Sequence, residues 1–253
     1  MCLIVLGKNI NKDYPLILLA NRDEFFNRPT LVLHHWEEGG ITGGKDLSAN
    51  GTWLGVNKSG KLAAITNYRD FKNLKKEAPS RGLLTLNFLK CEESPEEYIK
   101  QISSGAHMYN GFNLILGKGN HLVHYSNITG KITVMENGIY GLSNALLDTP
   151  WPKVEKSKKL FHSALTAKNI VDEQLIGLLS DRTTAEDDQL PDTGIELELE
   201  KKLSSMFIHF PGYGTRCTSL IKKDRDGNIS FTEVSYDEKG RRVRKENIKV
   251  GIH

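Results

Sequence analysis

The residue with the most direct chemical potential is Cys2, the second residue of a 253-residue chain. Removal of an initiator methionine requires a small second residue, and cysteine meets that requirement. The new terminus would carry a thiol and an α-amine on one residue. With a pKa of roughly 7.7–8.0, such an amine can act as the base for its own side chain. Position alone favours the other interpretation, in which Cys2 is a small buried residue at the start of a strand.

A charged segment is expected to return to this terminus. Apolar runs at 2–7 and 16–21 flank a polar turn and predict a β-hairpin, which brings the residues after position 21 beside residue 2. Arg22 could lower the pKa of the thiol or hold an anionic group. Asp23 or Glu24 could hold the terminal ammonium or orient Arg22. A strand-end turn with a simple ion pair is the alternative.

Polar residues also stand at other predicted strand ends. Asn67 and Asn144 carry amides that can donate to a developing oxyanion, although asparagine also commonly forms turns and caps. Arg216 lies inside an alternating strand, where a buried guanidinium needs a carboxylate or an anionic ligand. The predicted catalytic set is Cys2, Arg22, Asp23, Asn67, Asn144 and Arg216.

The predicted elements are grouped by type. Strands are expected before residue 68, a four-stranded meander over 112–145, and a final strand pair over 215–237. Helices are expected near 81–103, with Ser80 and Ser94 as N-caps, and within 151–205. Grouped strands predict an α+β fold rather than a doubly wound parallel sheet. No repeat or linker divides the chain, so we predict one domain over residues 1–253.

The composition is that of a globular protein. Hydrophobic residues make up 38% and charged residues 26%, with a formal net charge of +3. This charge is too small to argue for nucleic-acid binding, and the basic stretch 239–249 is interpreted as a solvated edge strand.

The sequence contains three cysteines, which are widely spaced and form no C-x-x-C motif, and this fits a reducing compartment. No segment approaches the roughly 20 apolar residues of a membrane span. We expect a cytoplasmic protein with no stable membrane insertion and no nucleic-acid partner.

No metal or cofactor motif is present in the sequence. The neighbouring histidines at 34 and 35 would point to opposite faces of a strand. Residues 224–228 suit a hairpin turn better than a calcium loop, and the glycines at 39–44 form no nucleotide fingerprint. No haem attachment motif occurs. We predict no resident metal and no cofactor, with haem considered only as cargo.

Several short motifs together resemble the NRDE family, whose animal members are called transport and Golgi organisation protein 2. The resemblance covers nearly the whole chain and is most specific at the N-terminus. It rests on Met1-Cys2-Leu3-Ile4, Ala20-Asn21-Arg22-Asp23-Glu24, Arg28-Pro29, Gly43-Gly44 with Asp46, Gly51-Thr52-Trp53-Leu54-Gly55, Thr66-Asn67-Tyr68, Ser80-Arg81-Gly82, Tyr109-Asn110-Gly111-Phe112-Asn113, Gly141-Leu142-Ser143-Asn144 and Thr215-Arg216.

That family in turn resembles the N-terminal-nucleophile hydrolases of the penicillin V acylase and bile-salt hydrolase type. The resemblance implies a four-layer αββα sandwich of two antiparallel sheets. It also implies that Cys2 is the nucleophile with Arg22 beside it, that Asn67 and Asn144 are oxyanion or substrate contacts, and that Arg216 lies at the site. Those hydrolases place a carboxylate about three residues after the first arginine. Here Asp23 and Glu24 follow Arg22 at once, so the identity of the supporting carboxylate stays open.

Two main functions follow from these expectations. The first is a cysteine amidohydrolase that cleaves an amide or related acyl bond of a small molecule. The alternative is a non-catalytic carrier for haem or an acyl-CoA-like lipid, in which Arg22 and Arg216 meet carboxylate or phosphate groups. The family has been linked to haem trafficking and to lipid metabolism, which fits such an anionic ligand. A protein-interaction module with a relict site is the third interpretation.

Overall fold

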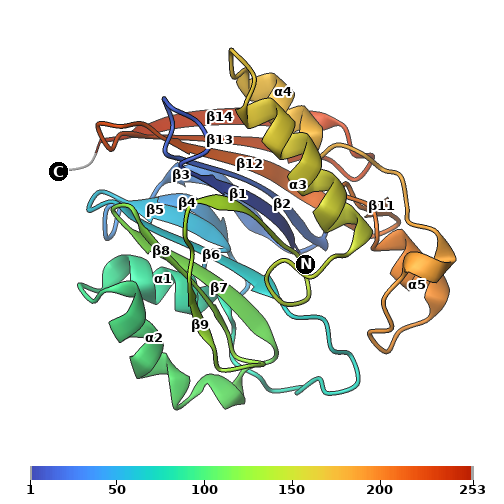
Figure 1. The fold of residues 1–253 in the computed structure, drawn as a ribbon. Coiled ribbons are helices and arrows are strands. Elements are labelled where there is room, and N and C mark those ends of the chain that lie inside the picture. Colours follow the sequence, from blue (N-terminus) through green and yellow to red (C-terminus); the bar gives the residue numbers. More distant parts are fainter. Residues whose placement is uncertain (1, 252–253) are drawn as a thin grey trace.

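Two antiparallel sheets packed face to face form the body of the molecule, and helices cover both outer surfaces (Figure 1). The computed structural model describes residues 2–251, except for the side chain of Cys2. The predicted loss of Met1 and the predicted chemistry of the Cys2 thiol therefore lie outside the described residues. The layer order is the four-layer αββα sandwich that the family resemblance implied, and the α+β prediction is confirmed.

The first sheet contains the predicted N-terminal hairpin at its centre. Its strand order is β10-β1-β2-β12-β13-β14, with β11 paired to β12. The basic C-terminal stretch forms an edge strand, as predicted. The strands are β1 (Cys2–Lys8), β2 (Leu16–Phe25), β10 (Gly138–Leu142), β11 (His209–Phe210), β12 (Tyr213–Lys223), β13 (Ile229–Tyr236) and β14 (Arg242–Val250).

The second sheet follows the chain order from β3 to β9. The strands are β3 (Thr30–His35), β4 (Ile41–Asp46), β5 (Leu54–Asn57), β6 (Lys61–Asn67), β7 (Phe112–Lys118), β8 (His121–Ser126) and β9 (Ile132–Val134). The predicted four-stranded meander is wrong in its last strand. After β9 the chain leaves this sheet, and β10 pairs with β1 in the other one.

The helices cover the sheets in two groups. The first group, α1 (Gly82–Lys90) and α2 (Pro95–Ser103), packs on the second sheet, and the second group, α3 (Pro152–Leu165) and α4 (Asp172–Leu178), packs on the first (Figure 1). The short helices are α5 (Leu197–Lys202), η1 (Ala106–Met108) and η2 (Asp187–Gln189).

One of the two predicted N-caps is confirmed. The Ser94 hydroxyl accepts from the Glu97 amide, and the Glu97 carboxylate accepts from the Ser94 amide, so α2 begins with a capping box. Ser80 is not a cap, because α1 begins one residue later and its N-cap is Arg81, which makes no side-chain cap bond.

Strand alternation builds three apolar layers from these elements. In β1, Ile4 and Leu6 join the core between the two sheets, while Leu3 and Val5 join the core beneath the helices of the first sheet. A third core lies between the second sheet and its helices. The strands therefore carry apolar residues on both faces, which is why β1 and β2 are continuous apolar runs rather than alternating ones.

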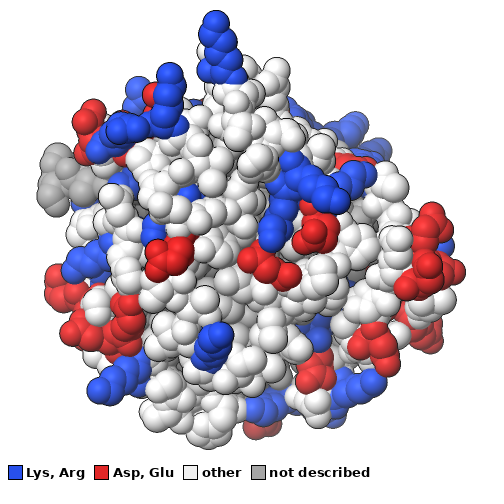
Figure 2. Space-filling view, viewed as in Figure 1, with Lys and Arg blue, Asp and Glu red and all other residues white. Residues whose placement is uncertain are grey.

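Charged side chains are scattered over the outside of these layers. Acidic and basic groups are interspersed over the face shown in Figure 2, as a formal net charge of +3 would suggest. Within residues 2–251, no helix is both long and apolar enough to cross a membrane.

Candidate active site

The ends of strands from both sheets surround a cavity of about 330 Å³. Strand β2 of the first sheet forms one wall. Strands β4 and β6 of the second sheet and the segment 78–82 form the others. The residues that line it are mainly polar, and they are Arg22, Asp23, Glu24, Arg28, Asp46, Thr52, Trp53, Ile65, Asn67, Ala78, Pro79, Ser80, Arg81, Gly82 and Asn110.

The backbone of Cys2 lies beside this cavity. The first hairpin pairs β1 with β2 so that Cys2 is opposite Arg22 and Leu3 is opposite Asn21. Arg22 lines the cavity and is buried. The predicted neighbourhood of residue 2 and Arg22 is therefore present at the level of the backbone, and it follows directly from the register of the hairpin.

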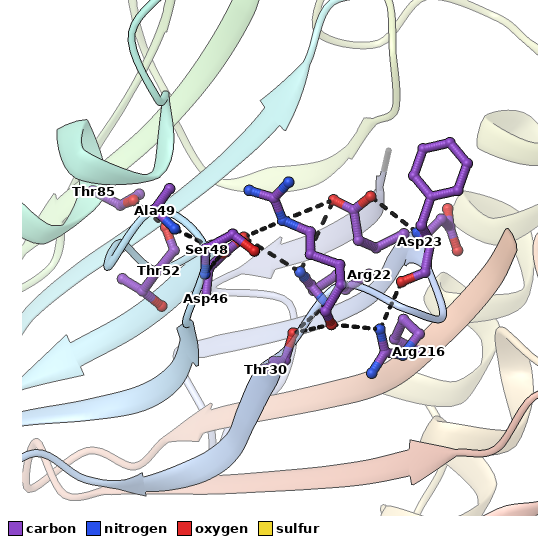
Figure 3. A network of polar contacts seen from close by, with 12 residues as sticks. Arg22, Asp23, Thr30, Asp46, Ser48, Ala49, Thr52, Thr85 and Arg216 are labelled. Atoms are coloured by element: carbon purple, nitrogen blue, oxygen red, sulfur yellow. Dashed lines mark hydrogen bonds and ion pairs between the residues drawn. The ribbon is translucent and has the colours of Figure 1, made fainter. Parts of the chain in front are cut away.

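Arg22 is held over the ring of Trp53. Its guanidinium carbon lies 4.2 Å from the ring centroid, a cation–π contact. Its Nη1 donates to the Thr30 hydroxyl at 3.3 Å, and its Nη2 lies 3.7 Å from an Asp46 carboxylate oxygen and 4.0 Å from one of Glu24. Figure 3 shows Thr30 and Asp46 beside Arg22. The guanidinium is thus fixed on one face by an aromatic ring and at its edge by acidic groups.

A second arginine completes this charge network. The Arg28 Nε donates to Asp46 at 2.6 Å and lies 3.8 Å from Glu24. Asp46 is itself oriented by the backbone, because the amides of Ser48 and Ala49 donate to its other oxygen at 2.9 and 3.1 Å. Two arginines therefore share two carboxylates along one wall of the cavity.

Asp23 and Glu24 occupy different surroundings. Successive strand residues point to opposite faces, so Glu24 shares the face of Arg22 while Asp23 faces the helical layer. The Asp23 carboxylate accepts from the Thr215 hydroxyl at 2.7 Å, and burial raises its pKa above the ordinary value. The structure therefore distinguishes the two carboxylates that the sequence could not: Glu24 belongs to the arginine network, and Asp23 is a buried acid behind it.

The two predicted asparagines lie together, but in different roles. Asn67 ends β6 and lines the cavity, and its side-chain amide makes no hydrogen bond within residues 2–251. Asn144 is buried outside the lining. Its amide donates to the Asn67 carbonyl at 2.9 Å, and its carbonyl accepts from the Arg69 amide at 2.7 Å. Asn144 thereby ties the end of β10 in one sheet to the end of β6 in the other.

Arg216 is placed at a β-bulge rather than in the cavity wall. The register between β12 and β2 shifts between Thr215 and Cys217, which makes Arg216 the extra residue. Its Nη1 donates to the carbonyls of Phe25 at 2.7 Å and Arg28 at 3.1 Å, as Figure 3 shows. Arg216 thus braces the turn that carries Arg28. Its guanidinium is satisfied by backbone carbonyls, where the sequence suggested a carboxylate or a ligand.

Of the fifteen residues that line the cavity, only Arg22, Asp23 and Asn67 belong to the predicted catalytic set. Arg28, Asp46, Trp53 and Arg81 all belong to short motifs of the family resemblance. Gly44, which belongs to the same motif as Asp46, lies against Trp53. A Cβ at position 44 would lie 2.2 Å from the Trp53 ring. The glycine therefore makes room for the ring on which Arg22 rests. No cluster of three or more metal-ligating side chains occurs within residues 2–251.

The chain is similar to known proteins over nearly all of its length. A profile of the family described as Transport and Golgi organisation 2 matches residues 1–238. The human Transport and Golgi organization protein 2 homolog is 38% identical over 262 residues, with 94% of each chain covered. The bovine homolog is 37% identical over 257 residues, with 93% of each chain covered.

A solved structure shares the fold. The Caenorhabditis elegans ortholog of N-acylethanolamine-hydrolyzing acid amidase superposes with a TM-score of 0.52 at 11% identity, covering 87% of this chain and 92% of the other. This likeness concerns the arrangement of sheets and helices alone. On the family profile and the animal homologs, the chain belongs to the Transport and Golgi organisation 2 family.

Proposed function

We propose that this protein is a cysteine amidohydrolase whose nucleophile is Cys2 after removal of Met1. The observation that carries the proposal is the hairpin register, which sets residue 2 opposite Arg22 on the wall of a polar cavity. The family membership and the shared fold support it. The name of the solved worm protein describes hydrolysis of an amide, which is the reason for choosing an amide as the first substrate class.

The proposed reaction uses the terminal amine as the base. The amine takes the proton from the Cys2 thiol, and the thiolate attacks the substrate carbonyl carbon. The positive charge of Arg22 favours the thiolate over the thiol. The Asn67 amide lines the cavity and can donate to the oxyanion that forms on the carbonyl oxygen. Asn144, through its bond to the Asn67 carbonyl, holds Asn67 in position.

The cycle closes by proton return and hydrolysis. The terminal ammonium gives its proton to the leaving nitrogen as the C–N bond breaks, which leaves a thioester on Cys2. A water molecule, deprotonated by the same amine, then attacks the thioester. This releases the carboxylic acid and restores the thiol. Asp23, buried beside β12, is proposed to support the charged terminus, and Glu24 to orient Arg22 and Arg28.

The test is hydrolysis of N-acyl amides together with trapping of the thioester. The wild-type chain is expected to release amine and to accumulate an acyl adduct on the Cys2 peptide when quenched in acid. Cys2→Ser should lose the thioester, whereas Cys91→Ser should retain both signals because Cys91 lies on the far side of the second sheet, against Lys61. Hydrolysis that survives in Cys2→Ala would contradict the proposal.

The carrier function is the second candidate, and one observation favours it. Arg22, Arg28 and Arg81 line the same cavity. A ligand with carboxylate or phosphate groups could bind these arginines, in competition with Glu24 and Asp46 at Arg22 and Arg28. In this case haem or an acyl-CoA-like lipid would be cargo. Cys2→Ala would then leave ligand affinity unchanged, while Arg81→Gln would weaken it. An unchanged affinity in Arg81→Gln would argue against the carrier.

A further inference from the structure

A turn beside the cavity exposes apolar side chains among lysines. It lies in the long connection between β6 and α1, drawn in cyan along the lower side of Figure 1, where it extends away from both sheets. Phe71 is 39% exposed and Leu74 is 51% exposed, and Met108 of the neighbouring η1 is 53% exposed. Lys72, Lys75 and Lys76 are exposed between them. We call these six residues the apolar–basic rim.

The rim is a fixed structure. Both oxygens of Asp70 accept from Asn73, at 3.2 Å from its backbone amide and 2.8 Å from its side chain. These bonds close a turn of the type in which an aspartate side chain organises the following backbone. Phe71 and Leu74 are therefore presented to solvent by an ordered turn.

Hydrogen bonds join the rim to η1 and to the cavity wall. The Lys75 amide donates to the Asn110 side chain at 2.8 Å, and the Asn110 side chain donates back to the Lys75 carbonyl at 3.0 Å. The Lys75 ammonium donates to the carbonyl of His107 and to that of Tyr109 at 3.4 Å, which places Met108 beside the turn. Asn110 also lines the cavity, so the rim and the cavity share a residue.

This combination points to a lipid surface. Apolar side chains at the tip of a projecting turn can enter the boundary between headgroups and acyl chains, while long lysine side chains keep their ammonium groups among the headgroups. Anionic lipids add attraction that falls off within a Debye length. Segment 70–77 carries three lysines against Asp70 and Glu77, a net charge of +1. Lys72 also pairs with Asp192 at 3.5 Å, but both side chains are exposed, and an exposed pair of this kind contributes little.

We infer that the apolar–basic rim docks this protein reversibly on an anionic membrane surface, with the cavity facing the bilayer. The docking does not depend on the proposed hydrolysis. Where that function also holds, the rim would let an acyl ligand pass from the lipid to the cavity along segment 78–82, which continues from the rim into the cavity wall.

The test is co-sedimentation with vesicles of phosphatidylcholine alone or mixed in equal amounts with phosphatidylserine. Wild-type protein should bind the mixed vesicles and bind less as salt is raised. The Phe71→Ser/Leu74→Ser variant should bind at least about tenfold more weakly, since two apolar side chains lose their burial. Lys72→Gln/Lys76→Gln should lose about fivefold per lysine. Lys75 is left intact because its ammonium holds η1.

A matched control variant distinguishes vesicle binding through the rim from binding through any exposed apolar side chain. Val243 is 61% exposed on the edge strand β14, and Val243→Ser should bind as the wild type does. Cys2→Ala should also bind unchanged, so failure of the hydrolase proposal would not affect this result. Thermal unfolding of each variant establishes that the fold is retained.

A second measurement reports insertion directly. In Phe71→Trp, the added fluorescence should shift to the blue with mixed vesicles and be quenched by brominated acyl chains. Wild-type protein that stays in solution with every vesicle, as it would if the rim bound a protein partner instead, overturns the inference. So does binding that the rim variants retain in full, or a Phe71→Trp signal that brominated chains leave unchanged.

Discussion

The guanidinium of Arg22 rests on the ring of Trp53, 4.2 Å from its centroid, and this contact joins the two sheets at the cavity. Arg22 belongs to β2 of the first sheet, and Trp53 directly precedes β5 of the second. A cation–π contact that is partly desolvated contributes about 1–2 kcal/mol. The position of Arg22 opposite Cys2 therefore depends on the packing of one sheet against the other.

Replacing Trp53 should weaken both the fold and the site. Trp53→Leu removes the ring beneath Arg22, and we expect a loss of about 2 kcal/mol in the free energy of unfolding. The Arg22 side chain would also lose its fixed position, so alkylation of Cys2 should slow. Trp36 provides a matched control, because it lies under Lys45 at 5.0 Å and does not line the cavity. Trp36→Leu should cost stability but leave the alkylation rate unchanged.

Gly44→Ala should also disturb the contact between Arg22 and the ring of Trp53. The new Cβ would lie 2.2 Å from the Trp53 ring, which must move. Overpacking of this kind typically costs about 1–3 kcal/mol, measurable by urea unfolding. Gly177 in α4 has no atom within 4 Å of a built Cβ, so Gly177→Ala should be neutral or stabilising by up to about 1 kcal/mol. Equal effects of the two changes would argue against a space-making role for Gly44.

The two serines that the sequence proposed as caps give a direct contrast. Ser94→Ala removes the capping box of α2 and should destabilise the protein by about 1 kcal/mol. Ser80→Ala should change the free energy of unfolding by less than half of that, because Ser80 caps no helix. Chemical denaturation of both variants under identical conditions measures the difference.

Much of the fold could be predicted because many of its elements are determined by residues close together in the sequence. The hairpin of β1 and β2 and the strand groups follow from apolar runs and turn residues, and the edge strand β14 was predicted from its basic residues. The pairing of β10 with β1 could not be predicted in this way, because it joins residues more than a hundred positions apart and depends on the whole sandwich. The cap of α1 was predicted one residue too early, because serine is a favoured N-cap residue whereas the helix has Arg81 at that position without a side-chain cap bond.

The same distinction between local and long-range contacts applies to the candidate site. Arg22 beside residue 2 follows from the register of one hairpin, and Asn67 reaches the cavity because it ends β6. The partners of Arg22 come from the other sheet, so neither Asp46 nor Trp53 could be paired with it from spacing. Arg216 was expected to meet an anion, but a β-bulge turns it toward the carbonyls of Phe25 and Arg28.

Stability should fall in mild acid because of His124. Burial lowers the pKa of His124 from 6.5 to about 4, and its Nε2 lies 3.2 Å from the Asn113 side-chain oxygen. As the pH drops through this window, the unfolded chain binds a proton that the folded chain does not. The free energy of unfolding therefore decreases, by up to about 3 kcal/mol.

Denaturant titrations between neutral pH and pH about 4 measure this slope. His124→Gln should flatten it, whereas His107→Gln should not, because His107 is exposed. A slope that persists in His124→Gln would assign the acid sensitivity to other groups.

Mapping of cysteine alkylation by intact mass and peptide mass spectrometry tests the central claim most directly. The account predicts that the purified chain lacks Met1 and that a limiting amount of iodoacetamide labels Cys2 first. It also predicts that the pH midpoint of labelling lies below about 8.5, the ordinary cysteine pKa, and rises in Arg22→Gln. Retention of Met1, or labelling of Cys91 and Cys217 while Cys2 stays unmodified, would contradict it.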